Sequence, residues 1–83
     1  MRQFEIKKNG HEWQATHCDT GISAFIPSVE TQPKAVLLAM ADDYLYWFEC
    51  QERKIQVSDH QMIATKNFML DIDFTKEDAE RLQ

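Results

Sequence analysis

Apolar and polar residues alternate on both sides of Asn9-Gly10. This dipeptide is typical of a tight type I′ turn, in which both central residues take positive φ. Because side chains alternate along a strand, a hairpin folded about this turn gathers its apolar side chains on one face. These are Phe4, Ile6, Trp13 and Ala15. The predicted pairs are Lys8 with His11, Lys7 with Glu12, Ile6 with Trp13, Glu5 with Gln14, and Phe4 with Ala15.

A third strand is predicted from Ile22 to Ile26, after a turn that contains Gly21. Ala24 shares one face with the two isoleucines, whereas Phe25 lies on the other face. We therefore expect this strand to be covered on both faces.

A long helix follows, because no glycine or proline interrupts the chain from Ala35 to about Glu52. Pro33 suits the first turn of a helix, where its missing N–H costs nothing, and Thr31 is a cap candidate just ahead. At about 100° per residue, the apolar side chains gather on one broad face. That face comprises Val36, Leu37, Met40, Ala41, Tyr44, Trp47 and Phe48. The opposite arc comprises Ala35, Ala39, Asp42, Tyr46, Glu49 and Arg53.

The apolar face of this helix is wider than a surface helix needs to cover a small sheet. Leu38 and Leu45 lie on its flank. Either the C-terminal strand or helix covers this flank, or a second chain does. In the second case the two leucines would form an isologous dimer interface.

The segment after the long helix is harder to assign. A short strand over residues 54–57 fits, and so does a short helix capped by Ser58 or Asp59 that runs through Met62 and Ile63. We favour the helix.

Alternation returns from Phe68 to Phe74, a pattern typical of a half-buried strand. Thr75 and Asp78 then resemble a capping box, with Asp in place of the usual Glu, and start a terminal helix through Leu82. The predicted fold is a single α+β domain over residues 1–83. A three- or four-stranded antiparallel sheet packs on one long helix, in the order β-β-β-α-(α)-β-α.

The formal net charge is −5, and acidic residues dominate the end of the chain. Direct binding to nucleic acid would need the opposite sign. The acidity favours a basic protein partner, although a role in solubility alone also fits. The candidate contacts in the final stretch are Asp71, Asp73, Glu77, Asp78 and Glu80. A second patch comprises Tyr46 and Asp42, since an exposed tyrosine supplies contact area at low entropic cost.

No apolar run approaches the roughly 18 residues of a membrane span, and the start of the chain lacks the apolar stretch of a signal peptide. We therefore expect a cytoplasmic protein that makes no membrane contact. In that compartment Cys18 and Cys50 are expected to be reduced and structural.

Residues that could carry chemistry are few. Zinc needs about four converging nitrogen or sulfur ligands, and His11 and His17 lie at opposite ends of the predicted hairpin. We therefore expect no metal and no cofactor. A thiol nucleophile would need Cys18 or Cys50 beside a histidine, which the spacing does not indicate.

Asp71 and Asp73 would point to one side of their predicted strand. Such a pair suits acid–base chemistry or a divalent ion, and a minimal hydrolase is the enzymatic alternative. An exposed strand face that is kept charged to prevent edge-to-edge aggregation explains the same pattern, and we favour that interpretation.

Three predicted strands, within Phe4–Ile6, Glu12–Ala15 and Ile22–Ile26, precede the helix opening Thr31-Gln32-Pro33-Lys34-Ala35. This arrangement resembles the N-terminal domain of HicB-like antitoxins, in which a three-stranded antiparallel sheet precedes a helix that opens with Thr-x-Glu-Glu-Ala. The resemblance covers about half the chain. A proline and a lysine replace the acidic pair, and Cys18-Asp19-Thr20-Gly21 replaces the Pro-Asp-x-Pro-Gly type loop of the family. The DNA-binding segment of such antitoxins is missing, unless the last residues are its remnant.

The sequence thus predicts a small non-enzymatic protein-binding module. It would act like an antitoxin or a phage-encoded inhibitor, with carboxylates that occlude the basic surface of a nucleic-acid-handling protein. The alternative is a homodimeric structural or regulatory subunit without catalytic activity.

Overall fold

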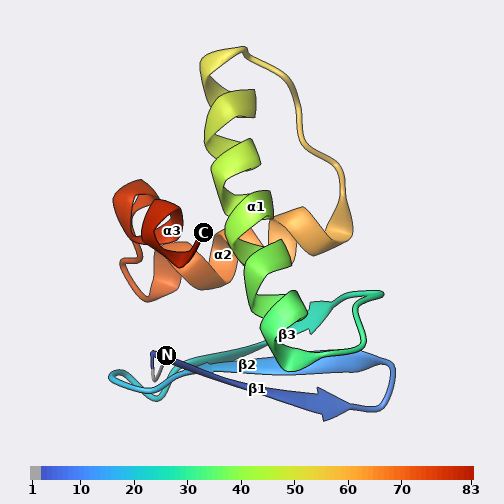
Figure 1. Ribbon diagram of the computed structural model, residues 1–83. Helices are drawn as coiled ribbons and strands as arrows, with labels where there is room; N and C mark the ends of the chain where they lie inside the picture. The colour runs from blue at the N-terminus through green and yellow to red at the C-terminus, as the bar shows by residue number, and fades with distance from the viewer. Residues whose placement is uncertain (1–2) are drawn as a thin grey trace.

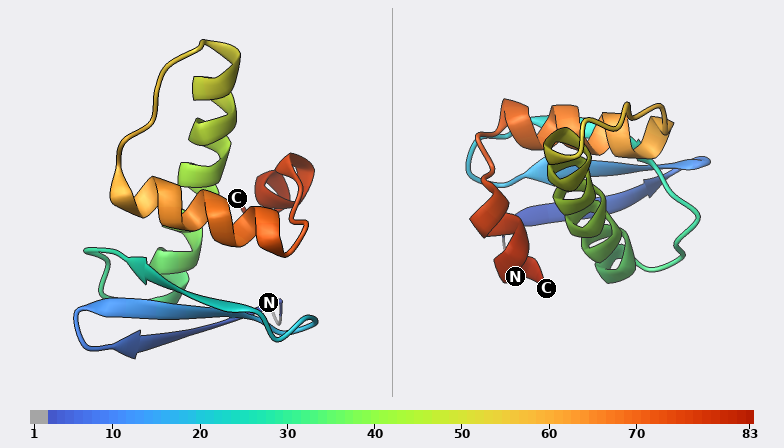
Figure 2. Two further views of the ribbon diagram at one scale, coloured as in Figure 1. Left: turned by 180° about the vertical axis from the view of Figure 1, so that it is seen from behind. Right: turned by 90° about the horizontal axis from the view of Figure 1, so that it is seen from above.

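The computed structural model describes residues 3–83 and has an α+β fold (Figure 1). The strands are β1 (Phe4–Asn9), β2 (Glu12–His17) and β3 (Ser23–Pro27), and the helices are α1 (Pro33–Glu52), α2 (His60–Asp71) and α3 (Lys76–Leu82). The antiparallel sheet has the order β1-β2-β3, so β1 and β3 are its edges. All three helices lie on one side of the sheet (Figure 2), which confirms the predicted fold class. Within residues 3–83, no helix combines the length and apolar character that a membrane span requires.

The first hairpin turns at Gly10, but its strands pair two residues away from the predicted register. Asn9 pairs with Glu12, so Gly10 and His11 form the loop. Gly10 has φ 63°, and a glycine with positive φ at the first loop position is typical of a type II′ turn. A shift of two residues changes the partners but not the faces, so the predicted apolar face is confirmed. The observed pairs are Phe4 with His17, Glu5 with Thr16, Ile6 with Ala15, Lys7 with Gln14, and Lys8 with Trp13.

The sheet is covered on one face. Trp13, Ala15 and Ile26 are buried on the side that meets the helices. On the other side Phe25 keeps 51% of its surface exposed, so the prediction that β3 is covered on both faces is wrong. The helices pack on the side where all three strands offer apolar side chains, and the polar side of the sheet stays open.

Helix α1 begins at Pro33 as predicted, but its cap is Gln32 and not Thr31. It stands on the sheet at its N-terminal end, and its C-terminal turns project away from the sheet (Figure 1). Helices α2 and α3 pack against it, so the protein's own helices cover much of the broad apolar face. The buried residues of α1 are Val36, Met40, Ala41, Tyr44 and Cys50.

The predicted strand over Phe68–Phe74 is wrong, because its first four residues belong to α2 and a turn follows. Phe68 and Ile72 are four residues apart, a spacing that fits both a helix face and one side of a strand. Met69 and Leu70 discriminate between the two. Met69 is buried and Leu70 is 46% exposed, the reverse of the predicted alternation.

Both C-terminal helices have the caps that the sequence suggested. The carboxylate of Asp59 accepts a hydrogen bond from the backbone N–H of Met62 at 2.9 Å, which starts α2. Asp73 takes φ 55° in the turn after α2, a left-handed conformation that aspartate tolerates better than most residues. Thr75 and Asp78 form the predicted capping box of α3.

Two buried aromatic side chains tie the layers together through hydrogen bonds. The Tyr44 hydroxyl donates to the carbonyl oxygen of Phe74 at 2.7 Å, which holds α1 against the turn between α2 and α3. Trp13 Nε1 donates to the carbonyl oxygen of Glu30 at 3.1 Å and fixes the β3–α1 loop on the sheet. The rings of Phe4 and Phe74 lie 5.3 Å apart, so β1 reaches the same turn.

Replacing Tyr44 by Phe is expected to lower the free energy of unfolding by about 1–2 kcal/mol, because the buried Phe74 carbonyl loses its donor while the ring packing remains. Urea unfolding followed by tryptophan fluorescence measures this. The matched control is Tyr46→Phe, which removes a hydroxyl from an exposed side chain and is expected to change stability by less than about 0.5 kcal/mol. Equal losses in the two variants would contradict the proposed role of the hydrogen bond.

Thr65 in α2 is fully buried, and its Oγ1 has no hydrogen-bond partner within residues 3–83. Thr65→Val replaces this hydroxyl by a methyl group of similar shape and is expected to raise the free energy of unfolding by about 1 kcal/mol. Thr65→Ser keeps the hydroxyl, loses the methyl group and should lower stability by a similar amount. A destabilised valine variant in the same urea experiment would show that the hydroxyl is bonded in solution.

Candidate functional site

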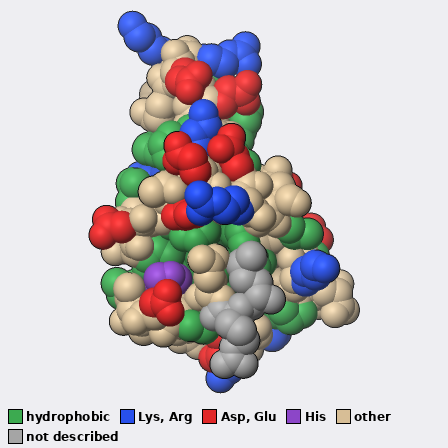
Figure 3. Space-filling view, turned by 60° about the vertical axis from the view of Figure 1, so that its left-hand side comes forward, with side chains coloured by type: hydrophobic (Ala, Val, Ile, Leu, Met, Phe, Trp, Pro, Cys, Tyr) green, Lys and Arg blue, Asp and Glu red, His purple; other side chains and the backbone are tan. Residues whose placement is uncertain are grey.

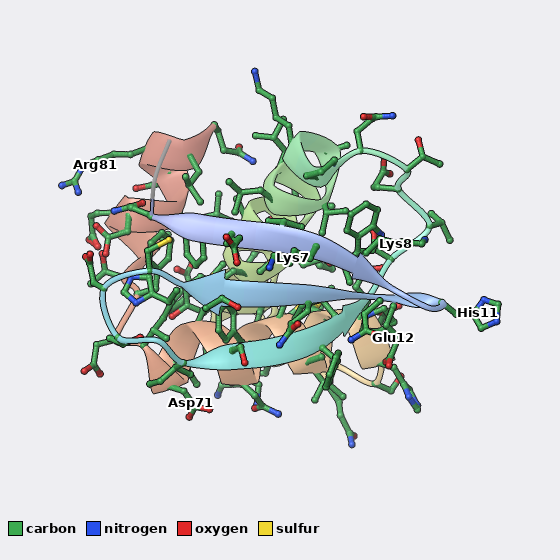
Figure 4. The ribbon with its side chains drawn as sticks, turned by 90° about the horizontal axis from the view of Figure 1, so that it is seen from below. Lys7, Lys8, His11, Glu12, Asp71 and Arg81 are labelled. Atoms are coloured by element: carbon green, nitrogen blue, oxygen red, sulfur yellow. The ribbon has the colours of Figure 1, made fainter. Side chains whose placement is uncertain are left out.

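The carboxylates expected to form the C-terminal patch lie in different parts of the fold. Asp71 ends α2 and Asp73 lies in the following turn, so the prediction that both point to one side of a strand is wrong. In Figure 4, Asp71 lies beyond β3, whereas Arg81 of α3 lies beyond β1 at the opposite edge of the sheet. Asp71 is therefore separated from the carboxylates of α3. Glu77 is exposed in the first turn of α3.

The carboxylate of Asp78 makes its polar contacts with residues of α3 and its N-cap. Its Oδ2 accepts the backbone N–H of Thr75 at 3.0 Å, and its Oδ1 lies 2.9 Å from the guanidinium of Arg81. The hydrogen bonds with Thr75 lower the pKa of Asp78 below 3.8, and the positive charge of Arg81 lowers it further. This carboxylate stabilises the start of α3 and has little capacity left for a partner.

A groove between α1 and α3 brings parts of the two predicted patches together. It has a volume of about 480 Å³ and is bordered by Asp42 and Tyr46 of α1 and by Glu80 of α3. These three residues were predicted as contacts, although Glu80 lies far from the other two in the sequence. We call this hollow the α1–α3 groove.

Two further carboxylates, Glu49 and Glu52, line the α1–α3 groove from α1. Neither was predicted as a site residue. The sequence did offer a signal for Glu49, because it lies two helical turns after Asp42 and therefore on the same face of the helix. Among the described residues, Lys76 is the only basic side chain that lines the groove, so four carboxylates face one lysine there. The side of the molecule that carries α3 shows acidic side chains set among basic ones (Figure 3).

The ion pairs around the α1–α3 groove are long and exposed. Lys76 Nζ lies 3.8 Å from Glu52, and the Arg53 guanidinium lies 3.8 Å from Glu49. Exposed pairs of this kind contribute about 0–1 kcal/mol, so a partner's cations could replace them at little cost. The side-chain amide of Gln83 donates to Asp42, which joins the end of α3 to α1.

Tyr46 supplies the aromatic surface of the groove. It is 48% exposed, whereas Tyr44 on the opposite face of α1 is buried. The ring of Tyr46 therefore lies exposed on the polar arc of α1, as predicted.

The two leucines predicted as a dimer interface lie in different environments. Leu45 is half-buried, packs against the core and lines the α1–α3 groove. Leu38 is 37% exposed and lines a different hollow beside β1.

Asp43 faces α2, next to the groove residue Asp42. Gln61 Nε2 donates to its Oδ2 at 3.0 Å. Burial raises the pKa of Asp43, and the negative charges of Asp59 and Asp42 raise it further. The shift follows from the position of this carboxyl at the contact of two helices, which is a structural role.

The two cysteines lie in different parts of the fold. Cys18 is exposed in the β2–β3 loop, and Cys50 is buried near the end of α1. His17 Nδ1 lies 2.9 Å from the Thr20 hydroxyl. Within residues 3–83 no three His, Cys, Asp or Glu residues are placed to hold a metal ion.

Asp78→Asn is expected to lower the free energy of unfolding by about 0.5 kcal/mol at pH 7, a small loss because the carboxylate is partly exposed and screened. Since the folded pKa lies below 3.8, the carboxylate stabilises the fold above pH 3.8. This stabilisation is lost as the pH falls through the folded pKa, so the difference between the two proteins should shrink between pH 7 and a pH well below 3.8. Urea titrations at both pH values measure the difference. Glu80→Gln, near the other end of α3, is the control and should cause no comparable loss of stability. If Asp78→Asn were as stable as the unmodified protein at pH 7, the role given to Asp78 would be wrong.

Comparison of the chain with protein-family models, with curated proteins and with solved structures finds no match in any of the three. The resemblance to HicB-like antitoxins therefore stays a prediction.

Proposed function

We propose that this chain is a small non-enzymatic protein-binding module that docks a basic partner in the α1–α3 groove. One observation carries the proposal: the exposed ring of Tyr46 is surrounded by carboxylates from two helices. Aromatic residues that are flanked by polar groups are typical anchors of protein interfaces.

The charge of the chain supports the same conclusion. With a net charge of −5, the protein attracts basic surfaces over long range, and the groove concentrates carboxylates where a partner's Lys or Arg would dock. The existing ion pairs at Glu49 and Glu52 are 3.8 Å long and exposed, so exchange for a partner's cations is inexpensive.

The proposed mechanism is occlusion. A partner that handles nucleic acid presents Lys and Arg to phosphate groups, and an acidic protein that occupies those side chains blocks that contact. Antitoxin-like proteins and phage-encoded inhibitors of the cytoplasm are the classes that the proposal names. It needs no cofactor, membrane contact or direct contact of this chain with nucleic acid. The homodimeric alternative has its own support in Leu38, which is exposed on α1.

The test is affinity capture with the tagged protein from a lysate of the source organism, followed by titration of the purified partner. Tyr46→Ala is expected to weaken binding at least about tenfold, as the loss of an interface anchor does. The double variant Glu49→Gln/Glu80→Gln should also weaken binding and should reduce its dependence on salt between about 50 and about 500 mM NaCl.

Asp19→Asn is the matched control, because this exposed carboxylate lies in the β2–β3 loop, outside the groove. It should bind like the unmodified protein. The proposal fails if the partner binds all variants equally, or if its affinity does not change with salt.

A further inference from the structure

Strand β1 has a free edge. It pairs with β2 alone in the described sheet, and Figure 4 shows it as the outer strand. The Cys18 N–H donates to the Gln3 carbonyl at 2.8 Å, which sets the direction of the backbone groups along this strand. Because these groups alternate, the odd-numbered residues of β1 bond to β2, and the even-numbered residues direct N–H and C=O outward. The outward set comprises Phe4, Ile6 and Lys8.

An apolar groove lies beside this edge, on the helix side of the sheet. It has a volume of about 500 Å³ and is lined mainly by apolar side chains, with one lysine among them. The lining residues are Phe4 and Ile6 of β1, Pro33, Lys34, Leu37 and Leu38 of α1, and Leu82 of α3. In Figure 4 the start of α1 and α3 both reach past β1, so a strand added to this edge would pair beneath them. Alternate side chains of that strand would enter the groove, as in other cases of strand addition to a sheet edge.

The charges of β1 indicate which strand fits. Glu5 and Lys7 lie on the open face of the sheet, with their charged atoms 3.4 Å apart. Two copies of β1 could pair antiparallel with Glu5 or Lys7 at the centre of the pairing. The two copies of that residue would then face each other across the two-fold axis, and like charges would meet. Pairing about Ile6 instead sets Glu5 opposite Lys7 of the second copy, twice, and places the two Ile6 residues opposite each other. Opposite charges in directly facing positions stabilise a strand pair, and like charges destabilise it.

The backbone supports the same register. Pairing about Ile6 matches Ile6 with Ile6 and Phe4 with Lys8, and all of these residues direct their backbone groups outward. If the antiparallel pairing were centred on Phe4 or on Lys8, only the ends of the two strands would overlap. Among the registers that satisfy the backbone, the one centred on Ile6 therefore combines the longest overlap with opposed charges.

We infer that the chain forms a two-fold symmetric dimer through antiparallel pairing of β1 with β1 of a second copy, centred on Ile6. The two sheets become one continuous sheet, and the apolar side chains around Ile6 and Leu38 are covered. Such an interface is isologous, because the same surface is used by both copies. None of the residues that line the apolar groove lines the α1–α3 groove, so the dimer leaves the acidic site accessible and does not rest on the function proposed for it.

The test is a charge exchange at the exposed positions 5 and 7, with the dimer dissociation constant measured by analytical ultracentrifugation. Glu5→Lys sets two pairs of lysines opposite each other, and Lys7→Glu sets two pairs of glutamates opposite each other. Each variant alone is expected to weaken the dimer about tenfold. An equal mixture of the two variants should recover the original affinity as a heterodimer, because every lysine then faces a glutamate. The double variant Glu5→Lys/Lys7→Glu should recover it as a homodimer.

Circular dichroism and urea unfolding confirm that each variant is folded, and the exposed positions make this the expected result. The inference is overturned if the unmodified chain stays monomeric up to about 500 µM, a concentration at which even weak dimers assemble. It is also overturned if the dimer forms but neither single charge reversal weakens it, or if the mixed variants fail to recover it. Loss of the basic partner in the capture experiment, with the dimer intact, would instead count against the proposed function alone.

Discussion

The hydrogen bond from the Tyr44 hydroxyl to the Phe74 carbonyl is the contact on which the arrangement of the helices depends. It joins the middle of α1 to the turn between α2 and α3, and Phe4 of the sheet packs against the same turn. A buried polar pair of this kind has one geometry that satisfies both groups, so it fixes the position of the turn along α1. Because the turn is fixed, α3 lies beside α1 and the α1–α3 groove exists.

The elements of this fold could be predicted where local rules decide them. Gly10 marks the first turn, Pro33 begins α1, and Thr75 with Asp78 begins α3. The pairing register of the hairpin was wrong because Asn-Gly fits two loop positions, and the alternation of side chains is the same for both. The strand predicted over Phe68–Phe74 was wrong because its apolar residues also fit a helix, and burial against α1 and the sheet decided between the two.

The sequence identified several residues of the candidate site, but it did not show that residues of α1 and α3 come together there. Asp42 and Tyr46 lie one helical turn apart, so the sequence could group them on one face of α1. Their meeting with Glu80 depends on the turn at Phe74 and on the chain reversal after α2, which no local pattern encodes. The expected strand would have placed Asp71 and Asp73 side by side, and its absence removes the argument for a carboxylate pair there.

Helix α3 connects the two hollows of the molecule. Glu80 borders the acidic α1–α3 groove, and Leu82, two residues later, lines the apolar groove beside β1. The helix has seven residues, too few to be stable by itself, so its position depends on the capping box and on packing against α1. A displacement of α3 therefore changes both hollows together. The charges of the two surfaces differ in kind: carboxylates predominate in the α1–α3 groove and suit a basic partner, whereas opposite charges alternate along β1 and suit a second copy of the same strand.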